Sequence, residues 1–345
     1  MIPSYSIDIF PRLFHFKKPA GTSRGVYTER RSWYVRVASA ACPGHEGWGE
    51  CAPLPQLSVD DLPDYEGVLR GICVEVARTG QVDTERWREY PSMLFGLETA
   101  LRHFERGTYA LWDTPFSRGE EGICINGLIW MGDHDAMYGQ IREKLEAGFR
   151  CVKLKIGAIG FEEELDLLRF IRRHFPAREV ELRVDANGAF APAEALDKLK
   201  RLAEFDLHSI EQPIRAGQWD EMAGLTSVSP LPVAFDEELI GHCSLEAKRR
   251  LLDALHPQYI VLKPSLHGGF SGCREWIEEA EKRNVGWWIT SALESNVGLN
   301  AIAQWCATWH TRMPQGLGTG MLFTDNVPMP LEIRKDCLWY VADGD

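Results

Sequence analysis

From residue 122 onward, short apolar runs alternate with longer segments in which apolar residues recur at helical spacing. This pattern predicts strands at residues 123–129, 151–156, 180–185, 208–212, 232–236, 258–263, 285–291 and 315–319. Helices are predicted between them, such as 135–147, 162–174, 192–204, 244–255 and 271–283. Alternating strands and helices indicate a parallel barrel or a doubly wound sheet, and the count of strands favours a (β/α)8-type barrel.

The N-terminal part of the chain has a different rhythm. Residues 1–16 and 26–41 alternate like strands around a polar loop at 21–25, and residues 92–106 carry an apolar helical stripe. Composition turns to Pro, Gly and Glu at 115–122, which is typical of a boundary. The predicted domains are an α+β module (1–118), a barrel (119–320) and a C-terminal segment that returns to the module (321–345).

Composition limits the classes of partner. The 345 residues carry a net charge of −12, which argues against a nucleic-acid surface. No stretch has the ~20 apolar residues of a membrane span, and the N-terminus has no signal-peptide pattern. Nine scattered cysteines without CxxC pairs indicate a reducing compartment. We expect a soluble cytoplasmic protein, of an oligomeric state that the sequence leaves open.

Charged residues alternate with apolar ones in the predicted barrel strands. Lys153 and Lys155 share one face of strand 151–156, and Glu181, Arg183 and Asp185 share one face of strand 180–185. The apolar faces of barrel strands meet the surrounding helices. The charged side chains are therefore expected to point into the barrel.

Five consecutive strands each end in an ionisable residue, and loop sequence soon follows. These residues are Lys155, Asp185, Glu211, Asp236 and Lys263, at spacings of 30, 26, 25 and 27. Barrel enzymes build their sites at the C-terminal ends of strands. Any one of the carboxylates could instead be a helix N-cap, but the joint pattern favours a site at one mouth of the barrel.

The three carboxylates Asp185, Glu211 and Asp236 are predicted to bind a metal, because converging carboxylates repel one another unless a cation lies between them. Oxygen-only ligation suits Mg²⁺, with Mn²⁺ as a substitute, better than zinc or copper. Asn187 and Glu237, which follow two of these ligands closely, are expected to support the site.

A metal bound to a substrate carboxylate would stabilise the charge that develops when the α-proton leaves. A lysine can take this proton when neighbouring cations lower its pKa, and Lys155 has Lys153 and the metal nearby. Lys263 would face the substrate from the other side. The sequence thus predicts a small-molecule carboxylate substrate and an enolate intermediate.

These motifs resemble the enolase superfamily, and within it the muconate-lactonizing-enzyme-like subgroup. The matching segments are Lys153-x-Lys155, Asp185-Ala186-Asn187, Glu211-Gln212-Pro213, Asp236-Glu237 and Lys263-Pro264. The resemblance covers nearly the whole chain. It implies that the N-terminal α+β module caps a (β/α)8-type barrel and that Mg²⁺ is the cofactor.

Segments 289–299 and 316–326 look like the seventh- and eighth-strand regions of o-succinylbenzoate synthases, and the Asp-x-Asp that dipeptide epimerases usually have in the eighth-strand region is missing from 316–326. Arg183 resembles an arginine of the synthases, although an ion pair with Glu181 would explain it equally well. The resemblance implies syn-dehydration of 2-succinyl-6-hydroxy-2,4-cyclohexadiene-1-carboxylate to o-succinylbenzoate, a step of menaquinone synthesis. Lys155 would be the base and Lys263 the cation that stabilises the enolate.

Predicted substrate contacts are Lys153, Arg183, Ser291, Gly318 in the 316–320 backbone, and Arg24 in the glycine-flanked loop. That loop could also be an ordinary surface hairpin, and the glycines could simply permit a tight turn. The alternative functions are an N-acylamino-acid racemase or dipeptide epimerase, a cycloisomerase, and an inactive barrel that serves as a scaffold. The core motifs alone do not distinguish the racemase, the epimerase and the cycloisomerase from the synthase.

Overall fold

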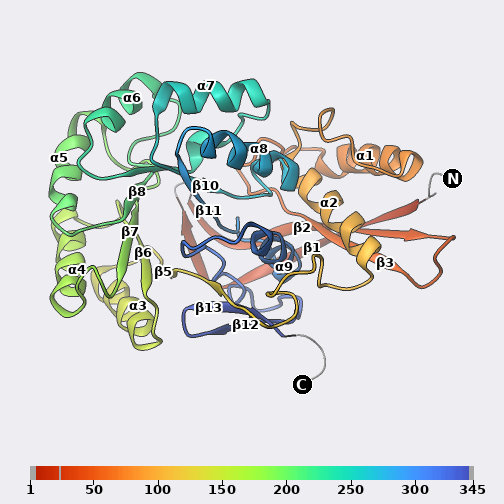
Figure 1. The fold of residues 1–345 in the computed structure, drawn as a ribbon, viewed down its shortest axis with the longest axis horizontal. Helices are drawn as coiled ribbons and strands as arrows, with labels where there is room; N and C mark the ends of the chain where they lie inside the picture. Colours follow the sequence, from red (N-terminus) through yellow and green to blue (C-terminus); the bar gives the residue numbers. More distant parts are fainter. Residues whose placement is uncertain (1–4, 23–24, 342–345) are drawn as a thin grey trace.

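The computed structural model describes residues 5–22 and 25–341, which form an N-terminal module beside a curved parallel sheet ringed by helices (Figure 1). In the module, an antiparallel sheet has the order β1-β2-β3, with β1 at Tyr5–Thr22, β2 at Gly25–Ser39 and β3 at Glu46–Cys51. Helices α1 (Tyr65–Thr79) and α2 (Pro91–Arg106) complete it. The first strand therefore extends beyond the predicted end at residue 16.

Close backbone contact joins β3 to α2. A Cβ atom added to Gly49 would lie 1.9 Å from the carbonyl oxygen of Gly96, so only glycine allows this approach. Around the contact, Val35 and Val37 from β2 pack with Leu97 and other buried residues of α2 in one apolar cluster. The three elements thus pack as a single unit.

The central sheet contains seven strands in the order β11-β10-β9-β8-β7-β6-β5, and all neighbours are parallel. The strands are β5 (Gly127–Ile129), β6 (Cys151–Lys155), β7 (Glu181–Asp185), β8 (Ser209–Glu211), β9 (Val233–Phe235), β10 (Tyr259–Leu262) and β11 (Gly286–Ile289). Helices connect them: α3 (His134–Glu146), α4 (Phe161–His174), α5 (Pro192–Ala203), α6 (Trp219–Val228), α7 (Leu245–Leu255), α8 (Gly269–Glu281) and α9 (Asn296–Cys306). Short 3-10 turns lie at Glu237–Leu239 and Ala307–Trp309. The predicted barrel strands and helices agree with these elements to within a few residues, apart from the first and the eighth strands.

The eighth strand predicted at 315–319 is wrong in form. Only isolated parallel bridges occur there, from Gln315 to Ile125 and from Gly316 to Thr290. They nevertheless join the two edges of the seven-stranded sheet. A side chain at Gly316 would collide with Thr290, because its Cβ would lie 2.2 Å from the hydroxyl oxygen. The close approach that completes the barrel therefore needs glycine.

The predicted strand 123–129 is interrupted, and its first part pairs with the C-terminal strands instead of with the barrel. Its first part, β4 (Ile123–Cys124), pairs with β13 (Cys337–Tyr340), which pairs in turn with β12 (Leu331–Arg334). Residues 322–324 instead lie against β1, where the Lys17 N–H donates to the Leu322 carbonyl at 2.8 Å. The domain boundaries stay a prediction. Within the described ranges, no helix is long and apolar enough to cross a membrane.

Candidate active site

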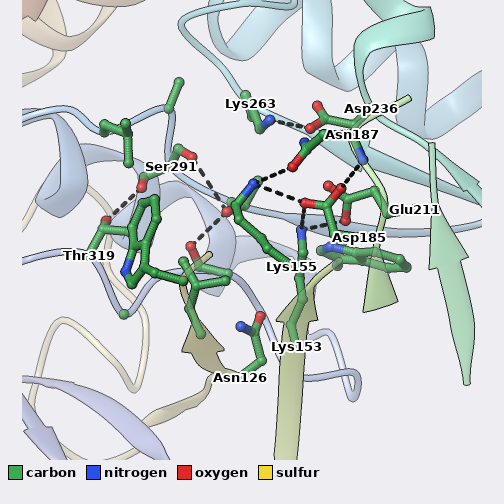
Figure 2. A pocket seen from close by; sticks show the side chains of 18 of the residues that line it. Asn126, Lys153, Lys155, Asp185, Asn187, Glu211, Asp236, Lys263, Ser291 and Thr319 are labelled. Carbon is green, nitrogen blue, oxygen red and sulfur yellow. Dashed lines mark hydrogen bonds and ion pairs between the residues drawn. The ribbon is translucent and has the colours of Figure 1, made fainter. Parts of the chain in front are cut away.

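Parallel register brings the predicted site residues to one mouth of the barrel. Lys155 lies opposite Asp185, and Asp185 lies opposite Glu211, on three adjacent strands. Asp236 and Lys263 directly follow β9 and β10. Figure 2 shows all five side chains converging, together with Lys153. We name these six residues the mouth cluster.

Each lysine of the mouth cluster contacts a carboxylate (Figure 2). The Lys153 ammonium donates to Glu211 Oε2 at 2.5 Å and lies 3.1 Å from Asp185 Oδ2. The Lys155 Nζ lies 3.2 Å from the same Asp185 oxygen, and Lys263 Nζ contacts Asp236. Strands β6 and β10, which lead to Lys155 and Lys263, have three strands between them, so the two ammonium groups approach from opposite sides.

Electrostatics within the mouth cluster are strongly coupled. Burial opposes ionisation of Asp185, but Lys153 and Lys155 outweigh it and hold its pKa below the usual range. Burial and the nearby Asp185 charge raise the pKa of Glu211 well above its usual value. The Lys263 pKa is raised despite burial, because the Asp236 and Glu237 carboxylates stabilise its ammonium form. Charge on each group therefore depends on its neighbours.

The chemistry of the carboxylates fits a hard divalent cation. Among the described residues, no three His, Cys, Asp or Glu side chains are placed as a ready metal-binding group, and the carboxylates contact lysines instead. However, no group in the described chain donates a hydrogen bond to Glu211 Oε1 or Asp236 Oδ1, although both atoms are buried. Leaving such atoms unsatisfied is costly, and oxygen donors are what Mg²⁺ prefers.

Two polar residues, Asn187 and Gln212, extend the site, and the sequence had singled out only Asn187. Asn187 accepts from Lys155 Nζ at 2.7 Å and donates to Glu237 at 3.0 Å, so it links the base candidate to the neighbouring loop. Its backbone φ of 44° lies in the left-handed region, which asparagine tolerates. Gln212, whose role the sequence did not reveal, accepts backbone N–H bonds from Asp236 and Glu238. It thus joins the loops that carry two of the metal-ligand candidates.

The remaining wall of the pocket is mainly apolar and comes from several segments. Ser291 and Gly318, two of the predicted substrate contacts, line it, and the Ser291 hydroxyl is 2.6 Å from that of Thr319. Residues that sequence reasoning missed also line it, among them Leu54, Leu57, Asn126, Trp130, Trp288, Thr290, Leu293 and Thr319. Apart from Trp288 in β11, they lie on loops or in the capping module, and no charge pattern in the sequence marks them. Arg24 lies outside the described residues.

Arg183 is buried in the barrel. The described residues that line the pocket do not include it. Its guanidinium pairs with Glu181 at 2.7 Å, donates to the Pro314 carbonyl at 3.0 Å and covers the ring of Trp288. The ion pair with Glu181, the alternative that the sequence had left open, is thus present, and direct substrate contact by Arg183 stays a prediction. Its link to the pocket is indirect, through Trp288.

Comparison with known proteins places this geometry in a family. Residues 136–340 match the family described as "Enolase C-terminal domain-like", and residues 22–104 match "MenC, N-terminal domain". The o-succinylbenzoate synthase of Desulfotalea psychrophila is 47% identical over 92% of this chain and 94% of its own length. Another, from Thermosynechococcus vestitus, is 26% identical over 88% of each chain.

Solved structures agree with this relationship. The crystal structure of MenC from Desulfotalea psychrophila superposes with a TM-score of 0.82 at 42% identity, covering 97% of this chain and 99% of its own. The L-Ala-D/L-Glu epimerase from Bacillus subtilis reaches a TM-score of 0.81 at 19% identity, with 97% and 95% covered. The second match shows the shared capped-barrel fold alone. The chain belongs to the enolase superfamily, and within it to the o-succinylbenzoate synthase family.

Proposed function

We propose that this protein dehydrates 2-succinyl-6-hydroxy-2,4-cyclohexadiene-1-carboxylate to o-succinylbenzoate, a step in menaquinone synthesis. The observation that carries this choice is the 47% identity to a named o-succinylbenzoate synthase along nearly the full length of both chains. Fold similarity could not carry it, because an epimerase superposes almost equally well. A cytoplasmic location stays a prediction.

Lys155 is the proposed base. Its amine takes the α-proton from the ring carbon that bears the carboxylate, and the bonding electrons move into an enolate. The resulting ammonium then gives the proton to the hydroxyl on the same face, which leaves as water as the ring becomes aromatic. Asn187 accepts from Lys155 Nζ at 2.7 Å and thereby fixes the direction of the amine.

Lys263 stabilises the developing negative charge from the opposite side of the substrate. Its ammonium already contacts Asp236, so it is held in place before substrate arrives. Asp185, Glu211 and Asp236 are the proposed ligands of Mg²⁺, which Mn²⁺ could replace. When bound, this cation would hold the ring carboxylate and supply positive charge to it. Lys153 balances the charge of Asp185 and Glu211.

The apolar wall and the hydroxyl groups orient the rest of the substrate. Leu54 and Leu57 from the capping module and Trp130 from the barrel exclude water from the reacting ring. The paired hydroxyls of Ser291 and Thr319, beside Gly318, are suited to hold the carboxylate of the succinyl arm. Arg24 remains a proposed contact to the same arm.

A spectrophotometric assay with the cyclohexadiene acid and Mg²⁺ tests the proposal. We expect rapid formation of o-succinylbenzoate. Proton exchange in deuterated water with N-succinylamino acids provides the competing assay for a racemase or epimerase. Fast racemisation without dehydration would show that the proposal is wrong. Inactivity in both assays, with no Mg²⁺ binding, would favour the scaffold alternative.

A further inference from the structure

Two glutamates of the capping module bind the backbone of barrel helices. Glu50 lies in β3 and is fully buried, and Glu98 lies on α2 and is partly buried. The described residues that line the pocket include neither of them. Each carboxylate nevertheless accepts N–H groups at the start of a helix that directly follows a pocket segment.

Glu98 caps helix α8. It accepts from the backbone N–H groups of Phe270 at 2.6 Å and Ser271 at 3.3 Å. The helix has no side-chain cap of its own, because its N-cap residue is Gly268. Free N–H groups and the positive end of the helix dipole favour a carboxylate at this position. The turn just before α8 begins with Lys263.

This turn is short and tightly bonded. The Lys263 N–H donates to the imidazole Nδ1 of His267 at 3.0 Å, and the His267 N–H donates to the Lys263 carbonyl at 3.0 Å. Phe270, at the end of the turn, packs edge-on against Phe95 of α2 with the ring centroids 5.2 Å apart. A shift of the α8 N-terminus would therefore be transmitted to Lys263.

Glu50 caps helix α9 in the same way. Its Oε1 accepts from the Ser295 N–H and its Oε2 from the Gly298 N–H, both at 2.9 Å. The Ser295 hydroxyl donates to the same carboxylate. Residues 291–293 of the preceding segment line the pocket, and the buried Arg30 of β2 bonds the Ala292 carbonyl. The capping module thus binds this segment through both an anion and a cation.

The two glutamates share one rigid support. Glu50 follows Gly49, whose backbone touches that of Gly96, and Glu98 comes two residues after Gly96. Burial raises the pKa of Glu98, and the hydrogen bonds from Ser271 and Phe270 partly offset this, so that the pKa is about 7. The charge of Glu98 therefore depends on this contact. The distance between the two carboxylates is therefore set within the capping module.

We propose that Glu50 and Glu98 are positioning residues that fix the Lys263 turn and the 291–295 segment relative to each other by capping α8 and α9 across the domain interface. This inference rests on the proposed function for its kinetic readout. It assigns Glu98 to the placement of Lys263 and Glu50 to the placement of the pocket wall. Removing each glutamate should then change a different kinetic constant.

The kinetic test compares E98Q and E50Q with S244A, at pH 8 in the full-length protein. Ser244 caps barrel helix α7 from within the barrel, accepting from the Ala247 N–H at 3.2 Å, and is the matched control. We expect E98Q to lower kcat about tenfold with little change in KM, because a small displacement of a reacting group is costly. E50Q should raise KM about tenfold, and S244A should lower Tm only.

Backbone deuterium exchange gives a readout that needs no substrate. E98Q should speed exchange in residues 263–273 and E50Q in residues 291–299, whereas S244A should leave both segments unchanged. If E50Q does not fold, G298A perturbs the same helix start, because a Cβ there would lie 2.7 Å from the Glu294 Cβ and 3.0 Å from Glu50 Oε2. Wild-type kinetics in E98Q and E50Q, or equal losses in S244A, would overturn the inference. An inactive wild type would refute the proposed function instead. The deuterium-exchange measurements on the variants would still decide whether Glu50 and Glu98 are positioning residues.

Discussion

Two buried clusters of charge lie near each other in this protein, and their carboxylate oxygens have different numbers of hydrogen-bond donors. In the interface cluster, formed by Arg30, Glu50, Glu294 and Ser295, both oxygens of Glu50 accept two hydrogen bonds each. In the mouth cluster, no described group donates to Glu211 Oε1. A carboxylate with both oxygens bonded, such as Glu50, marks a structural role, whereas an open carboxylate oxygen, such as Glu211 Oε1, marks a place for a ligand.

The largest expected effect comes from removing the base in the mouth cluster. K155A should lower kcat by at least about a hundredfold, because positioned proton transfer contributes that much or more. K200A, at an exposed helix position, is the control and should keep full activity. Circular dichroism of both variants checks that the fold is intact. Substantial residual dehydration by K155A would contradict the role of Lys155.

The second-largest expected effect is on Mg²⁺ binding, which should depend on the mouth cluster and not on the interface cluster. E211Q removes one charge of the proposed ligand set, so we expect calorimetry to show Mg²⁺ binding at least about tenfold weaker than in wild type. Mg²⁺ should raise the Tm of the wild type through binding to the folded state, and much less that of E211Q. Equal Kd values for the two proteins would mean that Glu211 is not a ligand.

The interface cluster should respond in stability rather than in metal affinity. E50Q turns an acceptor-only group into one that presents donors to N–H groups, and we expect a loss of about 2 kcal/mol in the free energy of unfolding. Urea titration measures this loss. The Mg²⁺ affinity should stay at the wild-type value. A parallel fall in Mg²⁺ affinity would mean that the clusters are one functional unit.

The smallest effect concerns a charge cluster outside both regions. Glu279 on α8 contacts Arg249, Lys282 and Arg283, and its bond with Arg249 leads the causes that lower its pKa to about 2. A lowered pKa stabilises the folded state above the unfolded pKa of about 4.3, and this gain is lost as the pH falls toward 2. The free energy of unfolding of the wild type should therefore exceed that of E279Q at pH 7. The difference should be at most about 1 kcal/mol, because the partners of Glu279 are partly exposed. A difference that persists at pH 2 would exclude this explanation.

The sequence alone predicted the mouth cluster well, because strand alternation and even spacing are local signals. Asp185, Glu211 and Asp236 each follow an apolar run. The parallel arrangement of the strands then brings these three side chains to the same end of the sheet. The seventh-strand segment also led correctly to Ser291 at the pocket. What could be predicted was thus whatever repeats with the period of the βα unit.

What was missed depends on contacts between distant parts of the chain. Glu50 and Ser295 are 245 residues apart, and nothing near Glu50 in the sequence marks it as a helix cap. Arg183 was ambiguous for the same reason, because its partners Trp288 and Pro314 come from far along the chain. The eighth strand was predicted in the wrong form because Gln315 and Gly316 each pair with a different edge of the sheet through an isolated bridge.

The way the barrel is completed has a consequence for its synthesis. In the described part of the chain, both edges of the seven-stranded sheet reach a common partner only at Gln315 and Gly316, after all seven strands. A growing chain on the ribosome therefore carries an open sheet with two unpaired edges until residues 315 and 316 have been made. Such edges invite pairing with other chains. Truncations that end between residues 263 and 315 should consequently aggregate or require a chaperone, although the whole mouth cluster has already been made.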